Sequence, residues 1–484
     1  MAKKKSGDKK KKEESELEKK LSFSPKSTWE GLSKKDIKKI YSFSRGYKEF
    51  LSKCKTESQS VEYAEKIARK EGFRKISEMK KISSGDRVYI KNRHKNIMLF
   101  RVGKKALADG LNIIAAHVDA PRLDLKPSPL AEDSDSQTAL FKTHYYGGIK
   151  KYQWVNVPMA LHGKVVRTDG KEIEIDIGEK KNDPVIVIPD LLPHLAAKQN
   201  RRTLREGIKG EEMRVIVGSR PLEDENAKYK IKLMVLKELN DRYGITEEDF
   251  VSAELEVVPA GPARDVGLDS SLVGAYGQDD RICAFTSVKA ILDMDKKIPK
   301  RTVGCILFDR EEVGSDGPTG VKSRFLLNAV GELMEKLDGA YREIELRRAL
   351  ERSFALSADV NGAINPMFKD VHEKQNAAVL GKGIVVTKYT GSGGKYNSSE
   401  ASAEFVAKVR RILNDAKIPW QPAELGKIDE GGGGTVAKFL ALHNMDVMDA
   451  GPALVSMHSP FEISSKADIY YTYLAYKEFF MNME

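Results

Sequence analysis

Five short segments, far apart along the chain, carry the residue types that bind metal ions. Four of them directly follow an apolar run typical of a buried strand, and the fifth precedes an expected helix. In chain order they are His117-Val-Asp119 after 111–116, Asp279-Asp280 before a helix near Arg281, Glu311-Glu312 after 303–308, Asp359 after 354–358 and His458 after 453–457. In open α/β sheets, ligands bind in the crevice at the carboxyl ends of the strands. We therefore expect these segments to meet at one site.

The residue types indicate which chemistry that site could perform. Two histidines with several carboxylates suit zinc, manganese or cobalt. A pair of metals about 3.5–4 Å apart needs a bridging carboxylate and further ligands on each side. The residues that could supply this set are His117, Asp279, Glu312, Asp359 and His458. Glu311, beside a ligand, could accept a proton from water, provided that an irregular loop lets both glutamates reach the site. Single acidic pairs are more often solvated surface, so the hypothesis rests on the whole set.

The elements that must position these residues form an α/β domain with an insertion. Residues 1–27 are almost without apolar content before Leu17 and are expected to be a disordered, lysine-rich tail. Residues 28–126 begin the catalytic domain, and residues 261–484 complete it with apolar strands and helices, one of them at about 399–416. Between them, isoleucines at 173, 175 and 177 alternate with acids, which predicts an antiparallel, β-rich insertion at 127–260.

Composition excludes several classes of protein. No run of 18 or more uncharged apolar residues occurs, which predicts no membrane-spanning helix. The lysine-rich start has no apolar stretch behind it, so no secretory signal is expected. Three cysteines without a Cys-x-x-Cys pair fit a reducing compartment, and we expect a cytoplasmic protein. Residues 1–12 hold +6 of the net charge of +11. The remainder is nearly balanced, which argues against specific nucleic-acid binding.

Five motifs together give the chain a family resemblance. They are Ala116-His-Val-Asp-Ala-Pro121, Gly277-Gln-Asp-Asp-Arg281, Phe308-Asp-Arg-Glu-Glu-Val-Gly-Ser315, Ser357-Ala-Asp-Val360 and Ser456-Met-His-Ser-Pro460. Each is short, but in this order and spacing they resemble the aspartyl aminopeptidase and vacuolar aminopeptidase I family of dinuclear zinc metallopeptidases. The resemblance runs from about residue 30 to the C-terminus. It implies a zinc-peptidase-type mixed sheet flanked by helices, an inserted dimerisation domain, and dimers that assemble into dodecamers.

The resemblance also implies a role for each residue. His117 would bind one zinc, oriented by Asp119, and Asp279 would bridge two zinc ions, for which cobalt or manganese could substitute. Glu311 resembles the general base and Glu312 a ligand, while Asp359 and His458 would complete the two coordination spheres. His194, in Ile188-Pro-Asp-Leu-Leu-Pro-His194, matches the histidine by which a neighbouring subunit contacts the substrate. A plain surface histidine is the alternative.

The substrate is less well defined by the resemblance. The segment from Gly383 to Lys395 looks more like the branch that favours neutral or apolar N-terminal residues, although Lys388 could pair with an acidic side chain. We expect a metallo-aminopeptidase that acts on peptides. A metal-dependent deacylase or carboxypeptidase on a related fold remains open, as does a non-catalytic scaffold or polyanion-binding protein that uses the tail.

Overall fold

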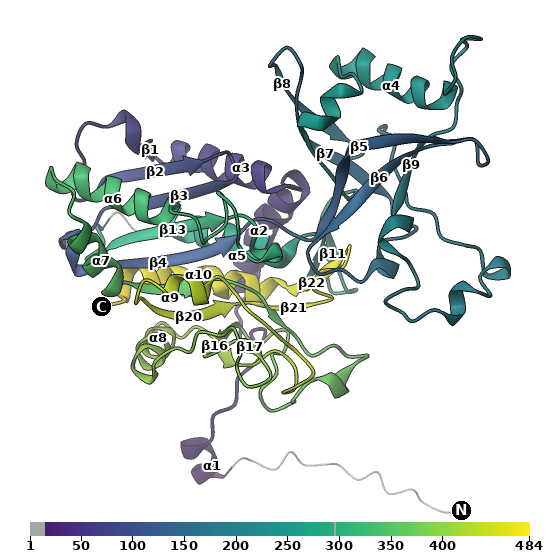
Figure 1. The fold of residues 1–484 in the computed structure, drawn as a ribbon. Helices are drawn as coiled ribbons and strands as arrows, with labels where there is room; N and C mark the ends of the chain where they lie inside the picture. Colours follow the sequence, from purple (N-terminus) through teal and green to yellow (C-terminus); the bar gives the residue numbers. More distant parts are fainter. Residues whose placement is uncertain (1–14, 295–296) are drawn as a thin grey trace, which may run out of the picture.

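The computed structural model describes residues 15–294 and 297–484 (Figure 1). Residues 1–14 of the expected tail lie outside the described residues. Within its remaining part, the chain forms the short helix α1 (Glu16–Leu21), and Phe23 stacks on Trp420 with ring centroids 4.7 Å apart. The carbonyl oxygen of Pro25 accepts a hydrogen bond from Lys382 Nζ at 2.8 Å. Residues 23–25 therefore make specific contacts with the body of the protein.

A nine-stranded mixed sheet forms the centre of the larger part of the molecule. Its order is β1 (Arg74–Lys75), β2 (Arg87–Asn92), β3 (Asn96–Arg101), β13 (Thr302–Phe308), β4 (Leu111–His117), β14 (Phe354–Ser357), β20 (Asp446–Gly451), β16 (Ile384–Thr387) and β18 (Trp420–Pro422). The four central strands, β13, β4, β14 and β20, run parallel to one another. Their carboxyl ends consequently share one edge of the sheet.

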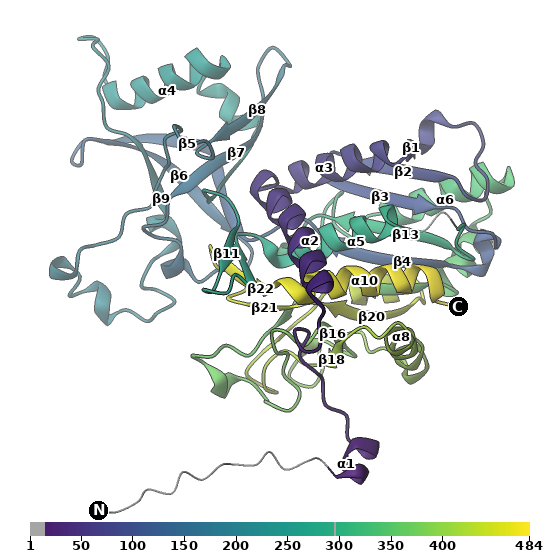
Figure 2. The same ribbon diagram turned by 180° about the vertical axis from the view of Figure 1, so that it is seen from behind.

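Helices cover both faces of this sheet, as Figures 1 and 2 show from opposite sides. One face packs against α2 (Lys34–Lys53), α3 (Glu57–Lys70), α5 (Gln278–Leu292), α8 (Ala403–Asp415) and α10 (Lys466–Asn482). The other packs against α6 (Phe325–Asp338), α7 (Glu343–Glu351) and α9 (Ala437–Ala441). Helix α8, expected at about 399–416, begins after Ser402, whose side chain accepts a hydrogen bond from the Phe405 N–H.

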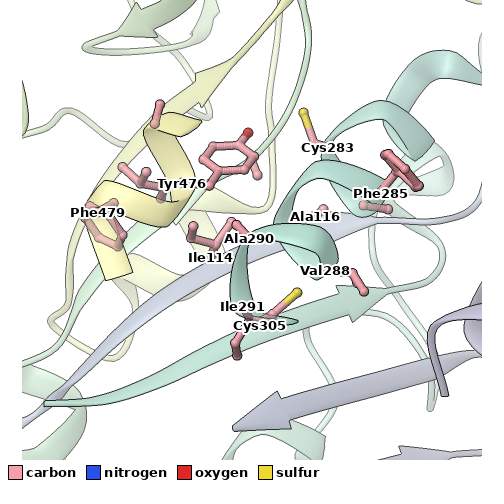
Figure 3. Packing of buried hydrophobic residues seen from close by; sticks show 14 of the residues in the cluster. Ile114, Ala116, Cys283, Phe285, Val288, Ala290, Ile291, Cys305, Tyr476 and Phe479 are labelled. Atoms are coloured by element: carbon pink, nitrogen blue, oxygen red, sulfur yellow. The ribbon is translucent and has the colours of Figure 1, made fainter. Parts of the chain in front are cut away.

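Strand β4 is apolar throughout because it is buried on both sides. Ile114 and Ala116 face one core and Ile113 and Ala115 the other, and all four side chains are fully buried. Figure 3 shows the first of these cores, where α5 and α10 bring their side chains together over β4 and β13. This packing determines where β4 ends, and therefore where His117 lies.

Residues 122–259 contribute the strands of a second sheet, which extends from one side of the molecule (Figure 1). Its six strands pair antiparallel in the order β8 (Glu172–Ile177), β7 (Met159–Val166), β10 (Ala253–Pro259), β5 (Arg122–Asp133), β6 (Thr138–Tyr146) and β9 (Arg214–Gly218). Helix α4 (Lys230–Tyr243) contributes to a separate core with these strands. In β8, Ile175 is buried between exposed acids, as the alternation predicted.

The expected start of the insertion, at residue 127, falls inside β5. The Pro- and Ser-rich stretch that suggested a boundary forms an irregularity in the strand, where the pairing register shifts between Leu125 and Leu130. Pro127 and Pro129 have no N–H to donate, so a break in the pairing accommodates them without loss of a hydrogen bond.

A third, five-stranded sheet joins the other two. Its order is β11 (Arg264–Val266), β12 (Leu272–Ala275), β22 (Glu462–Ser465), β21 (Ala453–Val455) and β15 (Asn361–Gly362). A two-stranded ribbon pairs β17 (Gly391–Ser392) with β19 (Gly432–Gly433). Within residues 15–294 and 297–484, no helix is both long enough and apolar enough to cross a membrane.

Candidate metal centre

The five predicted segments meet at one edge of the central sheet. His117 is the last residue of β4, Asp359 follows β14, and Glu311 and Glu312 form a 3₁₀ turn three residues after β13. That turn lets two adjacent glutamates face the same site. Asp279 lies at the start of α5, directly after the N-cap Gly277 and Gln278. The peptide bond between Asp279 and Asp280 is cis.

His458 reaches the site by a different route from the one expected. It follows β21, which belongs to the five-stranded sheet and not to the central one. The site is therefore built where the central sheet and the smaller sheet meet, because the ligand segments come from both.

Asp279 lies between the two histidines and offers one carboxylate oxygen to each. Its Oδ1 is 3.3 Å from His117 Nε2, and its Oδ2 is 3.1 Å from His458 Nε2. Two groups of possible metal ligands result: His117, Asp279 and Asp359 form one, and Asp279, Glu312 and His458 form the other. In each group the ligand atoms lie within 4.8 Å of one another. Asp279 is the member common to both.

The spacing of these atoms fits zinc. Zinc–nitrogen and zinc–oxygen bonds of about 2.0–2.2 Å in a tetrahedral arrangement place neighbouring ligand atoms about 3.3–3.6 Å apart. The separations of His117 and His458 from Asp279 are close to this value, as is the 3.4 Å between His458 Nε2 and Glu312 Oε2. Glu312 Oε1 is buried without a hydrogen-bond partner among the described residues. These residues therefore fit a metal cation.

The pKa values of the cluster also indicate a site for a cation. Burial raises the pKa of the Asp359 and Glu312 carboxyl groups well above the usual range, and the negative charge of Asp279 adds to the effect. Burial favours the neutral ring of His458, but its hydrogen bond with Asp279 and the charge of Glu312 outweigh this and raise its pKa to about 11. A bound cation would neutralise the crowded carboxylates, and it would take the place of the proton that the histidine ring otherwise binds.

Glu311 lines the same cavity but belongs to neither ligand group. Burial, with the charges of Asp119 and Asp279, raises the pKa of Glu311 to about 7, although His117 acts in the opposite direction. A carboxyl group with a pKa near neutrality is suited to exchange protons with a substrate.

Asp119 holds the turn that carries both glutamates. Its side chain is fully buried, and its two oxygens accept the backbone N–H groups of Glu311 and Glu312 at 3.1 and 3.2 Å. His117 Nδ1 lies 2.9 Å from the backbone oxygen of Asp119, which can only accept, so Nδ1 carries the proton and Nε2 is left to face Asp279. Asp119 thus contacts both halves of the cluster.

Sequence reasoning missed Glu462, which holds the backbone of the Asp279 and His458 segments as Asp119 holds that of the two glutamates. It is buried in β22, and its Oε2 accepts the N–H groups of Gln278 and Asp279 at 2.6 and 3.1 Å. Its Oε1 accepts the N–H of His458 at 2.8 Å. An acid flanked by Phe461 and Ile463 was the available signal, since a carboxylate in an apolar strand needs partners. Asp280, the residue after Asp279, accepts the His117 N–H at 3.3 Å.

The ligand groups open into a cavity of about 1010 Å³. Its walls include Tyr389, Glu424 and Met457, together with both glycine-rich segments of the β17–β19 ribbon. The volume is sufficient for several residues of a peptide, and the absence of side chains on the glycines lets backbone groups face it.

The two residues expected to contact the substrate, Lys388 and His194, lie outside the cavity lining. Lys388 lies between the cavity-lining residues Thr387 and Tyr389, and its Nζ is 3.5 Å from Glu400 Oε1. His194 is exposed in a 3₁₀ turn (Pro193–Leu195) that follows the loop after β8. Neither is among the residues that line the cavity within the described chain.

A buried carboxylate shared by two ligand groups, at the edge of a mixed sheet covered by helices, is typical of metal-dependent hydrolases. Comparison with known proteins identifies the family. Residues 50–480 match the family profile described as aminopeptidase I zinc metalloprotease (M18). The probable M18 family aminopeptidase 1 of Clostridium acetobutylicum is 49% identical over 461 residues, covering 94% of this chain and 98% of the relative.

Solved structures agree with this assignment. The crystal structure of the M18 aminopeptidase from Thermotoga maritima superposes with a TM-score of 0.91 at 49% identity, covering 96% of this chain and 100% of that one. The S. cerevisiae mApe1 dodecamer shares the fold, with a TM-score of 0.73 at 20% identity and coverage of 92% and 97%. The chain belongs to the M18 family of zinc metallo-aminopeptidases. The predicted family, mixed α/β fold and enzyme class are confirmed.

Proposed function

We propose that this enzyme removes single N-terminal residues from peptides at a dinuclear zinc centre. His117 and Asp359 would hold one ion, Glu312 and His458 the other, and Asp279 would lie between them. The observation that carries the proposal is that the two oxygens of Asp279 face the two histidines at 3.3 and 3.1 Å. One carboxylate is thereby available to both ligand groups.

Glu311 is the proposed general base. When bound, zinc would lower the pKa of water towards neutrality and polarise the scissile carbonyl group. Glu311 takes a proton from the water as its oxygen adds to the carbonyl carbon, and the peptide C–N bond then breaks. The carboxyl group returns the proton to the nitrogen of the leaving amine. Asp119 keeps Glu311 and Glu312 in place through their backbone N–H groups.

The preference for a free N-terminus would follow from the contact that the α-amino group makes. The free amine would bind at one of the metals or at a nearby carboxylate of the cavity, whose wall also includes Glu311. An N-acylated substrate has no free amine to make this contact.

Lys388 and His194 are proposed to contact the substrate in different ways. Lys388 would face an acidic first side chain only by leaving Glu400, which favours neutral or apolar residues as the usual substrates. His194 would complete the cavity of a neighbouring subunit and help to stabilise the oxyanion. Its flanking residues Leu192 and Leu195 are 49% and 67% exposed, which supports a contact surface there.

We also propose that the enzyme forms a homo-oligomer through its six-stranded sheet, and that the complete assembly is a dodecamer, as described for the mApe1 structure. Light scattering should give a mass many times that of one chain. A monomer that is fully active at micromolar concentration would contradict the role of His194. Three buried free cysteines support a reducing, cytoplasmic location.

The base assignment can be tested with Glu311→Gln. The amide keeps the size of the side chain but cannot take a proton, so kcat should fall by about 10²- to 10⁴-fold. Zinc content, measured by metal analysis, should equal that of the wild type. Asp316→Asn, an exposed carboxylate of the same loop, is the matched control and should retain activity. Normal turnover by the Glu311 variant would exclude the assignment.

A substrate panel separates the remaining alternatives. Aminoacyl amides should be cleaved, whereas N-acyl amino acids and peptides with a blocked N-terminus should not. The opposite preference would favour a deacylase or carboxypeptidase. A scaffold or polyanion-binding role would be favoured if deletion of the lysine-rich residues 1–14 removed the cellular phenotype while Glu311→Gln did not.

A further inference from the structure

One segment of the six-stranded sheet reaches into the metal centre. Strand β6 ends at Tyr146, and Gly147 and Gly148 follow it directly. The three residues pass beside ligand segments that come from the central and five-stranded sheets. Tyr146 contacts Asp119, and Gly148 contacts His458.

Tyr146 donates its hydroxyl hydrogen to Asp119 Oδ2 at a distance of 2.8 Å. The same oxygen accepts the Glu312 N–H, while Oδ1 accepts the Glu311 N–H. The ring of Tyr146 is itself held, because the Arg122 guanidinium lies 3.9 Å from its centroid. Tyr146 can therefore fix the direction in which Asp119 presents its oxygens to the glutamate turn.

Gly148 acts on the opposite side of the cluster. Its carbonyl oxygen lies 2.7 Å from His458 Nδ1 and can only accept, so Nδ1 carries the hydrogen. Nε2 is then the free nitrogen, and it faces Asp279 and Glu312 at 3.1 and 3.4 Å. A carbonyl group that fixes the tautomer of a metal-binding histidine also fixes the orientation of its ring.

Gly147 lets the segment approach this closely. Its φ is +74°, in the left-handed region, and a Cβ at this position would lie 3.4 Å from Glu312 Oε2 and 3.4 Å from Pro121 Cγ. A side chain here would strain the backbone, and its Cβ would already be in van der Waals contact with Glu312. Along this segment, the contacts with the metal centre are made by backbone and by one tyrosine side chain.

We propose that Tyr146, with the Gly147-Gly148 segment behind it, positions the glutamate turn and His458, so that the placement of the six-stranded sheet determines the geometry of the metal centre. Tyr146 is a positioning residue that acts through Asp119. The proposal rests on the function proposed above for Glu311 and Glu312, and it adds a dependence of that site on a sheet that supplies no ligand.

The test is Tyr146→Phe in the full-length enzyme, with Tyr145→Phe as matched control. Tyr145 is the preceding residue of β6, is 42% exposed and lies on the other face of the strand. Loss of the Tyr146 hydroxyl should lower kcat by about 10- to 100-fold, with a much smaller change in KM. Zinc affinity, measured on metal-free protein by competition with a chelator, should fall by a similar factor. The control should match the wild type in both measurements.

A double-mutant cycle then distinguishes positioning from general weakening of the fold. If Tyr146 acts through Asp119, Tyr146→Phe should have little further effect in an Asp119→Asn background. Additive effects, or a Tyr146 variant that equals Tyr145→Phe in kcat and zinc affinity, would overturn the proposal. Full activity of Glu311→Gln would remove the base assignment, while the zinc-affinity measurement would still decide the role of Tyr146.

Discussion

Glu462→Gln offers a test of how the ligand segments are held together. The carboxylate accepts three backbone N–H groups, from Gln278, Asp279 and His458. A glutamine has one accepting oxygen, so its NH₂ group must face at least one of these buried donors. An unsatisfied buried N–H costs about 1–3 kcal/mol. If the metal-bound conformation bears that cost, zinc affinity falls by about 5- to 150-fold, because each 1.4 kcal/mol corresponds to a factor of ten.

The assay is competition for zinc between a calibrated chelator and the metal-free variant, with kcat measured at saturating zinc. Asp468→Asn is the matched control, because Asp468 is also buried and accepts two backbone N–H groups, from Gly381 and Gly383, but contacts no ligand segment. It should change stability without changing zinc affinity. If Glu462→Gln binds zinc as the wild type does, or if both variants weaken binding equally, the reasoning about Glu462 is refuted.

Two further predictions concern pH and metal removal. Burial raises the pKa of Glu311 to about 7, and the proposed base must be ionised to act, so kcat/KM should rise as the pH increases through about 7. Zinc content should be measured at each pH, and a limb near the ordinary value of 4.5 would contradict the prediction. Removal of zinc should lower Tm, and by more at about pH 8 than at about pH 6. At the lower pH the carboxyl groups of Glu312 and Asp359, whose pKa values are raised, can take up protons and so relieve their mutual repulsion. Calorimetry at both pH values, with a surface ion-pair variant such as Asp316→Asn for comparison, checks the sign.

The contacts of Arg122 indicate that substitutions outside the metal centre could inactivate this enzyme. Arg122, which lies over Tyr146, is buried and contacts Glu57 and Glu256 at 3.6 and 3.3 Å. A charge that is buried in this way depends on its partners, and loss of one leaves the other uncompensated. Substitutions of Arg122 or of its partners should therefore disturb the metal centre, although these residues lie outside it.

Local patterns were sufficient for the parts of the fold whose signal lies in neighbouring residues. The apolar run at 111–116 predicted a strand buried on both faces, and the alternation at 172–177 predicted a half-buried one, because each pattern reports the surroundings of consecutive side chains. The Pro- and Ser-rich stretch near 127 suggested a domain boundary but lies within β5. A strand that tolerates an irregularity resembles a linker in composition.

The sequence by itself determined which residues could form a metal centre, because histidines and acids follow several buried strands as one set and the five motifs occur in the order of one family. Tertiary structure alone decided how they are arranged. It brought Asp279 between two histidines, placed His458 on a smaller sheet, and supplied Glu462 and Tyr146 from segments that carry no motif. The physical reason is that a hydrogen bond between distant segments depends on how sheets pack, and no local periodicity records that packing.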